Sequence, residues 1–284
     1  MQQLAVARGS MVKIIKKELL VPNIHFMVLA SDVIHQNAKP GEFVVVRADE
    51  AGERIPLNLV DWDNKSVSVV FMEVGTSTRK LGALKAGENI ADLAGPLGKP
   101  TEIVGEKRIL CIGGCYGIGA ILPVMKAFKE NKNQIFTVIE ARSSFLLYWQ
   151  DRLKKYSDEL YEITRDGTKG FAGHIDKFLN GFLVKNRIDL VYAQGCTYLT
   201  YLVSQTTKSY GIKTIVGLNP IMIDATGMCG VCRVIINGQT KFACVDGPEF
   251  DGHQVDWENL LTRRHIYMNE ERRSLSFYEC EKYG

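Results

Sequence analysis

The alternation of short apolar runs with segments of helical period between residues 101 and 220 constrains the fold of this chain most strongly. Apolar runs at 108–112 and 134–139 are followed by helix-period stretches at 118–129 and 145–155. Further apolar runs lie at 160–164, 189–193 and 213–218. Strands that alternate with helices in this way form parallel βαβ units. Residues 101–220 are therefore predicted to form a doubly wound parallel α/β nucleotide-binding domain.

The preceding segment, residues 11–100, has a different pattern. Its apolar runs are short and closely spaced, as at 24–29, 43–46 and 66–71, and turn-forming residues at 39–42 and 61–64 separate them. This pattern predicts a β-sheet or β-barrel domain. Residues 1–10 show no clear period, and Met11 is itself a possible start, so they carry no fold prediction. Residues 221–284 hold a cluster of cysteines and a charged tail and form a third segment.

Composition and charge exclude several classes of protein. The 284 residues include 35 basic and 32 acidic side chains, for a formal net charge of +3. This near balance argues against a nucleic-acid-binding protein, whose domain is normally far more basic. No apolar run approaches the roughly 18 residues of a membrane span, and the N-terminus does not resemble a secretion signal. We therefore expect a cytoplasmic protein whose seven cysteines are ligands, reactive groups or buried thiols rather than disulfides.

A glycine-rich loop, Gly113-Gly114-Cys115-Tyr116-Gly117-Ile118-Gly119, follows the first expected strand of the α/β segment. Glycines at this junction let the backbone approach a pyrophosphate, and the helix N-terminus offers free N–H groups and a positive dipole. The pattern departs from a strict G-x-G-x-x-G, so a tight strand-to-helix turn without a nucleotide is the alternative.

Two further strand ends, at Glu140 and at Gly195-Cys196, carry candidate cofactor-binding residues, and the second of them is expected to face the same crevice. Glu140 ends the second expected strand, where a carboxylate accepts hydrogen bonds from a ribose 2′-hydroxyl and repels a 2′-phosphate. This favours NAD(H) over NADP(H), although Arg142 could meet a phosphate, and a solvated strand end is the alternative. Gly195 and Cys196 end a later strand, and for Cys196 an ordinary buried thiol is the alternative.

The first segment contains two motifs that suit phosphate groups. Arginine binds phosphate oxygens with two parallel hydrogen bonds, and a glycine with hydroxyls before a helix offers further donors. The first motif is Arg54-Ile55-Pro56-Leu57-Asn58, and the second is Gly75-Thr76-Ser77-Thr78 before a helix-like stretch at 79–84. A solvent-facing arginine and a simple helix cap are the alternatives.

The cysteine cluster is the most specific motif. Cys229 and Cys232 form a C-x-x-C, and Cys244 follows twelve positions later. Plant-type [2Fe-2S] ferredoxins use C-x4-C-x2-C with a distant fourth cysteine, and here Asp224 occupies the first of these positions. The glycines at 227 and 230 suit a tight loop whose N–H groups point at sulfur. The motif predicts an iron–sulfur cluster, with zinc bound by three cysteines and one carboxylate as the rival.

Together, the R-x-P motif, the G-G-x-x-G-x-G loop and the C-terminal [2Fe-2S] motif resemble those of the ferredoxin–NADP reductase superfamily. Within it, residues 224–232, the sequence KFACVDGPEFDGH at 241–253 and VDW at 255–257 are similar to the small subunits of NADH-dependent reduced ferredoxin:NADP oxidoreductases. These belong to a group of electron-transfer subunits that includes the one of dihydroorotate dehydrogenase. The resemblance covers residues 11 to about 264 and does not extend to the tail.

This resemblance implies an FAD-binding β-barrel at 11–100, an NAD(H)-binding α/β domain at 101–220 and a small [2Fe-2S] domain at 221–284. It implies that FAD contacts Arg54, Pro56, Leu57, Asn58, Gly75, Thr76 and Ser77. It implies that NAD(H) contacts Gly113, Gly114, Gly117 and Glu140, with Gly195 and Cys196 at the same crevice. The implied ligands of the cluster are Asp224, Cys229, Cys232 and Cys244. Asn58 stands where the family more often has serine or threonine. No catalytic acid–base pair is expected, because the cofactors carry the chemistry.

The implied function is that of an oxidoreductase subunit in a heterodimer. Hydride would pass between NAD(H) and FAD, and single electrons would pass through the cluster to a large subunit with flavin and [4Fe-4S] clusters, in flavin-based electron bifurcation. Ferredoxin and NADP(H) would then react on that partner. A sulfide dehydrogenase or polysulfide reductase subunit, or a dihydroorotate dehydrogenase subunit, is the alternative within this class. Outside it, the alternative is a zinc-stabilised nucleotide-binding sensor.

Overall fold

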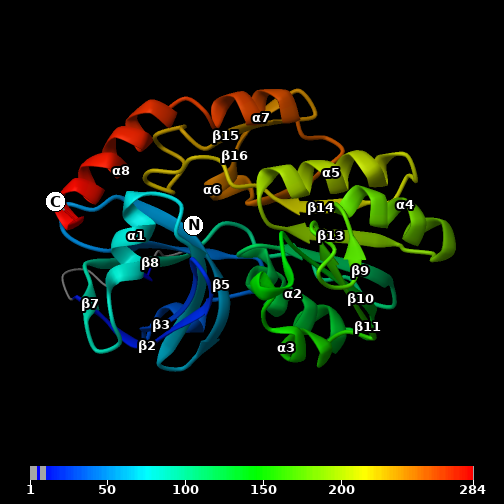
Figure 1. Cartoon of the computed structure of the whole chain (residues 1–284), viewed down its shortest axis with the longest axis horizontal. Coiled ribbons are helices and arrows are strands. Elements are labelled where there is room, and N and C mark those ends of the chain that lie inside the picture. Colours follow the sequence, from blue (N-terminus) through cyan, green and yellow to red (C-terminus); the bar gives the residue numbers. More distant parts are fainter. Residues whose placement is uncertain (1–4, 7–10, 284) are drawn as a thin grey trace.

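The computed structural model describes residues 5–6 and 11–283, and its first sheet is antiparallel and curls on itself (Figure 1). The strand order is β1-β8-β4-β5-β6-β3-β2-β7. Its strands are β1 (Ala5–Val6), β2 (Val12–Val21), β3 (Ile24–Ala30), β4 (Phe43–Arg47), β5 (Arg54–Asp63), β6 (Ser66–Met72), β7 (Asn89–Ile90) and β8 (Asp92–Leu97). The 3-10 turn η1 (Ile34–Gln36) and helix α1 (Thr76–Ala83) belong to the same segment.

A strand at one edge of this sheet and a strand near the other edge are close together in the sequence, so the sheet curls and brings its edges near each other. Strand β7 lies at one edge and β8 lies near the other, yet Ala91 alone separates them in the sequence. The Ala91 N–H donates to the carbonyl of Arg47 in β4, at 2.9 Å. The β-barrel predicted from the spacing of the apolar runs is confirmed in this curled form. The expected turn at 61–64 is displaced, because β5 continues to Asp63 and the turn falls at residues 64–65.

The second sheet has the order β12-β11-β10-β9-β13-β14-β17 and is parallel except at its last pair. Its strands are β9 (Arg108–Gly114), β10 (Gln134–Ala141), β11 (Glu159–Thr164), β12 (Phe171–Ala172), β13 (Leu190–Gln194), β14 (Thr214–Gly217) and β17 (Glu249–Asp251). The connecting elements are α2 (Gly117–Glu130), η2 (Ser144–Leu146), α3 (Gln150–Lys154), α4 (Ile175–Lys185) and α5 (Thr197–Lys208). The helix expected at 145–155 is therefore only a 3-10 turn and a short helix.

Helices cover both faces of this sheet. The side chains of α2 and α3 pack with Ile109 and Ile135, whereas those of α4 and α5 pack with Leu110 and Phe136. Neighbouring residues of one strand thus point to opposite helical layers, and the doubly wound α/β fold is confirmed. The strand order reverses between β9 and β13, and ligands of such sheets bind at the carboxyl ends of the strands where this happens.

The last segment is attached to both sheets. It contains β15 (Arg233–Ile236), β16 (Gln239–Phe242), α6 (Ala243–Asp246), α7 (Trp257–Arg263) and α8 (Met268–Tyr283). Strand β17 adds to the edge of the second sheet beside β14, and α8 reaches across to α1 of the first segment (Figure 1). The division into domains at residues 100 and 220 stays a prediction. None of the helices in the described part of the chain combines the length and the apolar character of a membrane span.

Candidate functional site

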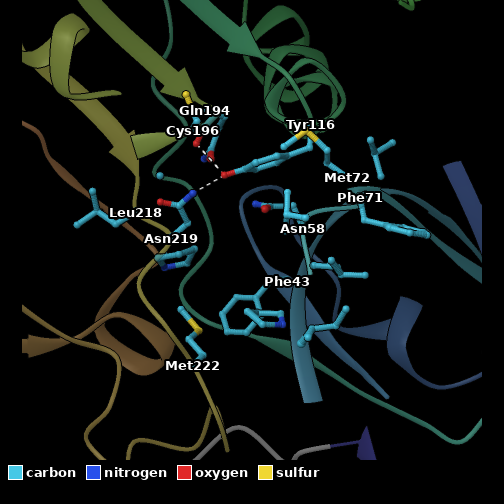
Figure 2. A pocket seen from close by; sticks show the side chains of 18 of the residues that line it. Phe43, Asn58, Phe71, Met72, Tyr116, Gln194, Cys196, Leu218, Asn219 and Met222 are labelled. Atoms are coloured by element: carbon cyan, nitrogen blue, oxygen red, sulfur yellow. Dashed lines mark hydrogen bonds between the residues drawn. The ribbon is translucent and has the colours of Figure 1, made fainter. Parts of the chain in front are cut away.

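A cavity of about 330 Å³ lies between the curled sheet and the carboxyl ends of β13 and β14 (Figure 2). Its volume falls within the range of small-molecule sites. Strands β5 and β6 supply one wall, and residues 194–196 and 217–220 supply the other. Among the predicted flavin residues, Pro56, Leu57 and Asn58 line this cavity, and among the predicted NAD(H) residues Gly195 and Cys196 do so. The structure therefore places parts of the two predicted cofactor sites on one cavity.

Hydrogen bonds join the far wall of the cavity through Tyr116, a member of the glycine-rich loop. Its hydroxyl donates to the carbonyl of Gly195 at 2.8 Å and accepts from the side-chain amide of Asn219 (Figure 2). Thr197 donates in turn to Asn219 at 2.6 Å and accepts from the guanidinium of Arg264. Burial raises the pKa of Tyr116, so the hydroxyl stays protonated. The loop, β13 and the C-terminal segment are thereby linked at the cavity.

The other predicted flavin residues lie beyond the cavity lining. Arg54 pairs with Asp92, with Nη2 3.1 Å from Oδ2, and more than half of its side chain is exposed. Helix α1 begins at Thr76, with Gly75 as its N-cap in extended conformation. Ser77 donates to Glu53 Oε2 at 3.2 Å, which brings the start of α1 beside β5. The predicted pyrophosphate donors thus share one edge, and their contact with FAD stays a prediction.

The glycines of the loop permit an unusually close approach of backbone segments. A Cβ at Gly117 would lie 2.1 Å from the carbonyl oxygen of Gln194, and one at Gly113 would lie 2.9 Å from Cα of Ile118. The N-terminus of α2 can therefore lie against the end of β13, at the point where the strand order reverses. A Cβ at Gly114 would lie 2.7 Å from the side chain of Leu199. The N–H groups of this helix start are placed where a dinucleotide pyrophosphate binds in such folds.

Glu140 is buried, with 2% of its side chain exposed, so the alternative of a solvated strand end is wrong. Its Oε1 accepts from Nε of Arg165 at 2.9 Å, and its Oε2 accepts from the N–H of Ile175 at 3.2 Å. The carboxylate thus stabilises the start of α4, where an anion is favoured. Arg142 is exposed nearby. Both carboxylate oxygens of Glu140 already accept hydrogen bonds, so a ribose hydroxyl would have to share one of them. The contact of Glu140 with the ribose stays a prediction.

Two thiols face each other at the crevice, on Cys115 and Cys196. Cys115 adopts a left-handed conformation, with φ 53°, and Cys196 is the N-cap residue of α5. The Cys115 thiol donates to Cys196 and lowers its pKa, and the N–H of Leu199 and the charge of Arg165 act in the same direction against burial. The same pairing and burial raise the pKa of Cys115. Cys196 therefore lies on the cavity wall with a lowered pKa, and its role in cofactor binding stays a prediction.

The predicted cluster ligands lie in two close pairs. The Cys229 thiol is 3.3 Å from Oδ1 of Asp224, and the sulfurs of Cys232 and Cys244 are 3.2 Å apart. Among the described residues, no group of three or more His, Cys, Asp or Glu side chains surrounds a single ion position. Two sulfurs on one tetrahedral metal with 2.3 Å bonds lie roughly 3.8 Å apart. The sulfurs of Cys232 and Cys244 are closer together than this, and the binding of a cluster by the two pairs stays a prediction.

The backbone of the cluster loop is shaped for such a group. Ala225, Gly227 and Gly230 have φ values of 59°, 83° and 67°, so the loop turns tightly between the ligands. Burial raises the pKa of the Asp224 carboxyl, but hydrogen bonds from the N–H of Thr226 and from the thiol and N–H of Cys229 outweigh it and lower the pKa overall. The aspartate is thus ionised and available as a ligand.

Comparisons with known proteins agree with this arrangement. Residues 219–256 match the family described as the iron–sulfur cluster binding domain of dihydroorotate dehydrogenase B. The dihydroorotate dehydrogenase B (NAD(+)) electron transfer subunit homolog of Thermotoga maritima is 39% identical over 262 residues, which cover 92% of this chain and 93% of the relative. This chain belongs to the family of dihydroorotate dehydrogenase B-type electron-transfer subunits.

A solved structure extends the comparison. The structure of the NADH-dependent reduced ferredoxin-NADP oxidoreductase, described in connection with flavin-based electron bifurcation, has a chain that is 36% identical, with a TM-score of 0.90 and coverage of 96% of this chain and 99% of that one. The FAD/NAD-binding domain of a Vibrio cholerae nitric oxide dioxygenase, at 14% identity and a TM-score of 0.61, shares the fold. The predicted membership of the ferredoxin–NADP reductase superfamily is confirmed.

As a member of the electron-transfer subunit family, the chain is an oxidoreductase component that works with a larger catalytic subunit. Its cofactors are FAD, NAD(H) and an iron–sulfur cluster. The ligand pairs fit the cluster, and the apolar cavity between the sheets fits the flavin ring. Sequence reasoning about this electron-transfer subunit missed Gln194, Asn219 and Arg264 of the cavity. Tyr116 could have been identified from the sequence, because an aromatic residue inside a glycine-rich loop is a candidate site residue.

Proposed function

We propose that the chain is the small subunit of an electron-bifurcating NADH-dependent reduced ferredoxin:NADP oxidoreductase. In this role it exchanges hydride with NAD(H) at FAD and relays single electrons through a [2Fe-2S] cluster to a large subunit that carries flavin and [4Fe-4S] clusters. Ferredoxin and NADP(H) react on that partner. The observation that carries the proposal is the pairing of Asp224 with Cys229, because dihydroorotate dehydrogenase subunits typically have cysteine at the first ligand position.

The cavity is the proposed site of the flavin ring. FAD supplies the ability to accept a hydride and to release electrons one at a time. Pro56, Leu57 and Asn58 of β5 hold the ring from one side, and the apolar walls exclude water from it. Arg54 and residues 75–77 bind the phosphates at the start of α1. Asn58 retains a hydrogen-bonding side chain where the family more often has a hydroxyl.

NAD(H) is proposed to lie along the crevice between β9 and β13. Gly113, Gly114 and Gly117 bring the start of α2 to the pyrophosphate, and Glu140 lies at the adenosine end. Gly195 and Cys196 line the same cavity as Pro56, so the nicotinamide end lies beside the flavin. This adjacency allows direct hydride transfer, which requires no acid–base pair from the protein.

The cluster is proposed to be held with two ligands on each iron. Asp224 and Cys229 bind one iron, and Cys232 and Cys244 bind the other. The arrangement in pairs supports iron–sulfur over mononuclear zinc, which needs four ligands around one point. An aspartate oxygen is a harder ligand than thiolate and favours the oxidised iron to which it binds.

An electron-transfer subunit of dihydroorotate dehydrogenase is the second candidate. An Enterococcus faecalis relative, 27% identical over 261 residues, carries that description, and the Thermotoga maritima relative is described as a homolog of this subunit. Anaerobic affinity purification of the native complex, with flavin, iron and partner analysis, separates the two. A partner with a second FAD and additional iron–sulfur clusters supports bifurcation. An FMN-containing partner that oxidises dihydroorotate overturns it.

The role of Asp224 is tested by Asp224→Cys. The variant should retain its cluster but show a changed midpoint potential in an EPR-monitored redox titration, because thiolate replaces a harder ligand. Thr226→Cys is the matched control, since it adds a cysteine at an exposed position of the same loop. An unchanged potential in Asp224→Cys removes Asp224 from the ligand set.

A further inference from the structure

A half-buried residue, Glu249, lies where all three segments of the chain meet, and its carboxyl group points into the protein toward Tyr192, Thr101 and Gln194. Strand β17 carries it from the cluster-bearing segment to the edge of the second sheet, where Glu249 is opposite Gly217. Its Oε1 accepts three hydrogen bonds, from the hydroxyl of Tyr192 at 2.5 Å, from Thr101 Oγ1 at 3.0 Å and from Gln194 Nε2 at 3.2 Å. A Cβ at Gly41 of the first segment would lie 2.9 Å from the same oxygen.

All three groups that donate to Glu249 are neutral. Other charged side chains on the surrounding elements engage one another or the backbone: Lys99 lies 4.0 Å from Asp246, Lys213 lies 3.6 Å from Glu102, Asp251 accepts from the N–H of His253, and Glu42 accepts from the N–H of Lys39. Tyr192 is the titratable group in contact, and burial together with Glu249 raises its pKa. Burial raises the pKa of Glu249 to about 7, although its hydrogen bonds act in the opposite direction.

This carboxyl is one side chain away from the cavity. Gln194 lines the cavity, and its Nε2 donates both to Glu249 and to the Tyr192 hydroxyl, at 2.8 Å in the latter case. The side chain of Gln194 also lies against Gly217, which lines the cavity as well. A negative charge that appears in the cavity therefore acts on Glu249 through a low-dielectric region, where charge interactions are strong.

We propose that Glu249 binds a proton when the flavin in the cavity is reduced and releases it when the flavin is reoxidised. The inference rests on the proposed placement of FAD. Hydride transfer from NADH gives NAD⁺ and adds two electrons and one proton to the flavin, which gains one negative charge. The Glu249 carboxylate binds one proton from solvent and restores the charge balance. When two electrons leave singly through the cluster, the flavin loses its proton and Glu249 loses the compensating one.

Glu249 acts through Gln194 and touches no reacting atom, so it is a positioning residue that compensates charge. The isosteric variant Glu249→Gln keeps an acceptor for Tyr192 and Thr101 but does not titrate. Thr101→Val is the matched control, because it removes one of the three hydrogen bonds and leaves the carboxyl in place. FAD content and iron content are measured for each purified complex before the test.

The experiment measures proton uptake when oxidised complex is mixed anaerobically with NADH in weak buffer containing a pH indicator. Hydride transfer itself takes no proton from solvent, so uptake reports groups that change their protonation. Near pH 7, wild type and Thr101→Val should each take up more protons per FAD than Glu249→Gln does. The difference should be a substantial fraction of one proton. In spectroelectrochemical titrations, the flavin potential of Glu249→Gln should depend less steeply on pH around 7.

Equal proton uptake and equal pH dependence in a Glu249→Gln complex that retains FAD overturn the inference and leave the proposed function intact. A wild-type complex without FAD in this chain overturns the proposed function instead. Where Glu249→Gln fails to assemble, Glu249→Asp replaces it, because a shorter carboxyl side chain loses its contact with Gln194 but still titrates. A pH of half-maximal uptake that differs from that of wild type supports the proposal, and an unchanged one refutes it.

Discussion

Gly117→Ala tests whether the glycine-rich loop is built around backbone packing. Gly117 is the first residue of α2, and a Cβ there would lie 2.1 Å from the carbonyl oxygen of Gln194, 2.4 Å from its carbonyl carbon and 2.6 Å from the nitrogen of Gly195. All three are backbone atoms, so no change of rotamer relieves the contact. The helix start must move away from β13 by about 0.9 Å to restore a 3.0 Å separation.

The expected cost follows from this movement. Overpacking of a well-packed interior destabilises by about 1–3 kcal/mol. Gly181, inside α4, is the matched control, because a Cβ there has no atom within 4 Å. Alanine in a helix interior is more stable than glycine by about 0.5–1 kcal/mol. The same substitution should therefore destabilise at 117 and stabilise at 181, with a difference of about 2 kcal/mol or more.

The assay is thermal unfolding of both variants and wild type, prepared identically with cofactors bound, together with NADH titration. The difference corresponds to roughly 5 °C in Tm for domains of this size. Because the start of α2 moves, NADH affinity should fall in Gly117→Ala and stay unchanged in Gly181→Ala. If Gly117→Ala unfolds at or above the temperature of Gly181→Ala, the packing argument is refuted.

Three further predictions follow from the same geometry. Glu140→Gln leaves Arg165 without its charge partner and weakens the start of α4, so the free energy of unfolding should fall by about 1–2 kcal/mol. Chemical denaturation of variant and wild type at the same pH measures this difference. An unchanged free energy would show that the ion pair of Glu140 with Arg165 does not stabilise the protein. Iodoacetamide should label Cys196 faster than Cys280 at neutral pH and should continue to label it at lower pH, because the pKa of Cys196 is lowered and the thiolate present above that pKa is the nucleophile. Mass spectrometry with and without NADH measures the labelling rates and any protection by NADH. Equal labelling rates for the two cysteines would contradict the lowered pKa of Cys196. Cys229→Ser should reduce bound iron, whereas Cys280→Ser, in exposed α8, should not; iron analysis decides, and equal iron contents would count against Cys229 as a ligand.

Much of the fold could be predicted because its signals are local. The apolar runs at 24–29, 43–46 and 66–71 correspond to β3, β4 and β6, and those at 108–112 and 134–139 correspond to β9 and β10. Alternation along a strand and the period of a helix depend on neighbouring residues only. The expected turn at 61–64 shows the limit, since polar residues at 61 and 63 lie on the exposed side of β5 near its end.

By itself, the sequence determined which segments are β-rich and which are α/β, and it identified the loop at 224–232 as the predicted cluster-binding loop. These features could be read from the sequence because residues a few positions apart share one strand, turn or loop. The tertiary structure decided which distant side chains meet. It placed Glu249 against Thr101 and Tyr192, and it laid α8 over α1 through Thr76 and Ser274, 2.9 Å apart. Such contacts depend on how separately folded sheets pack together, which no local periodicity encodes.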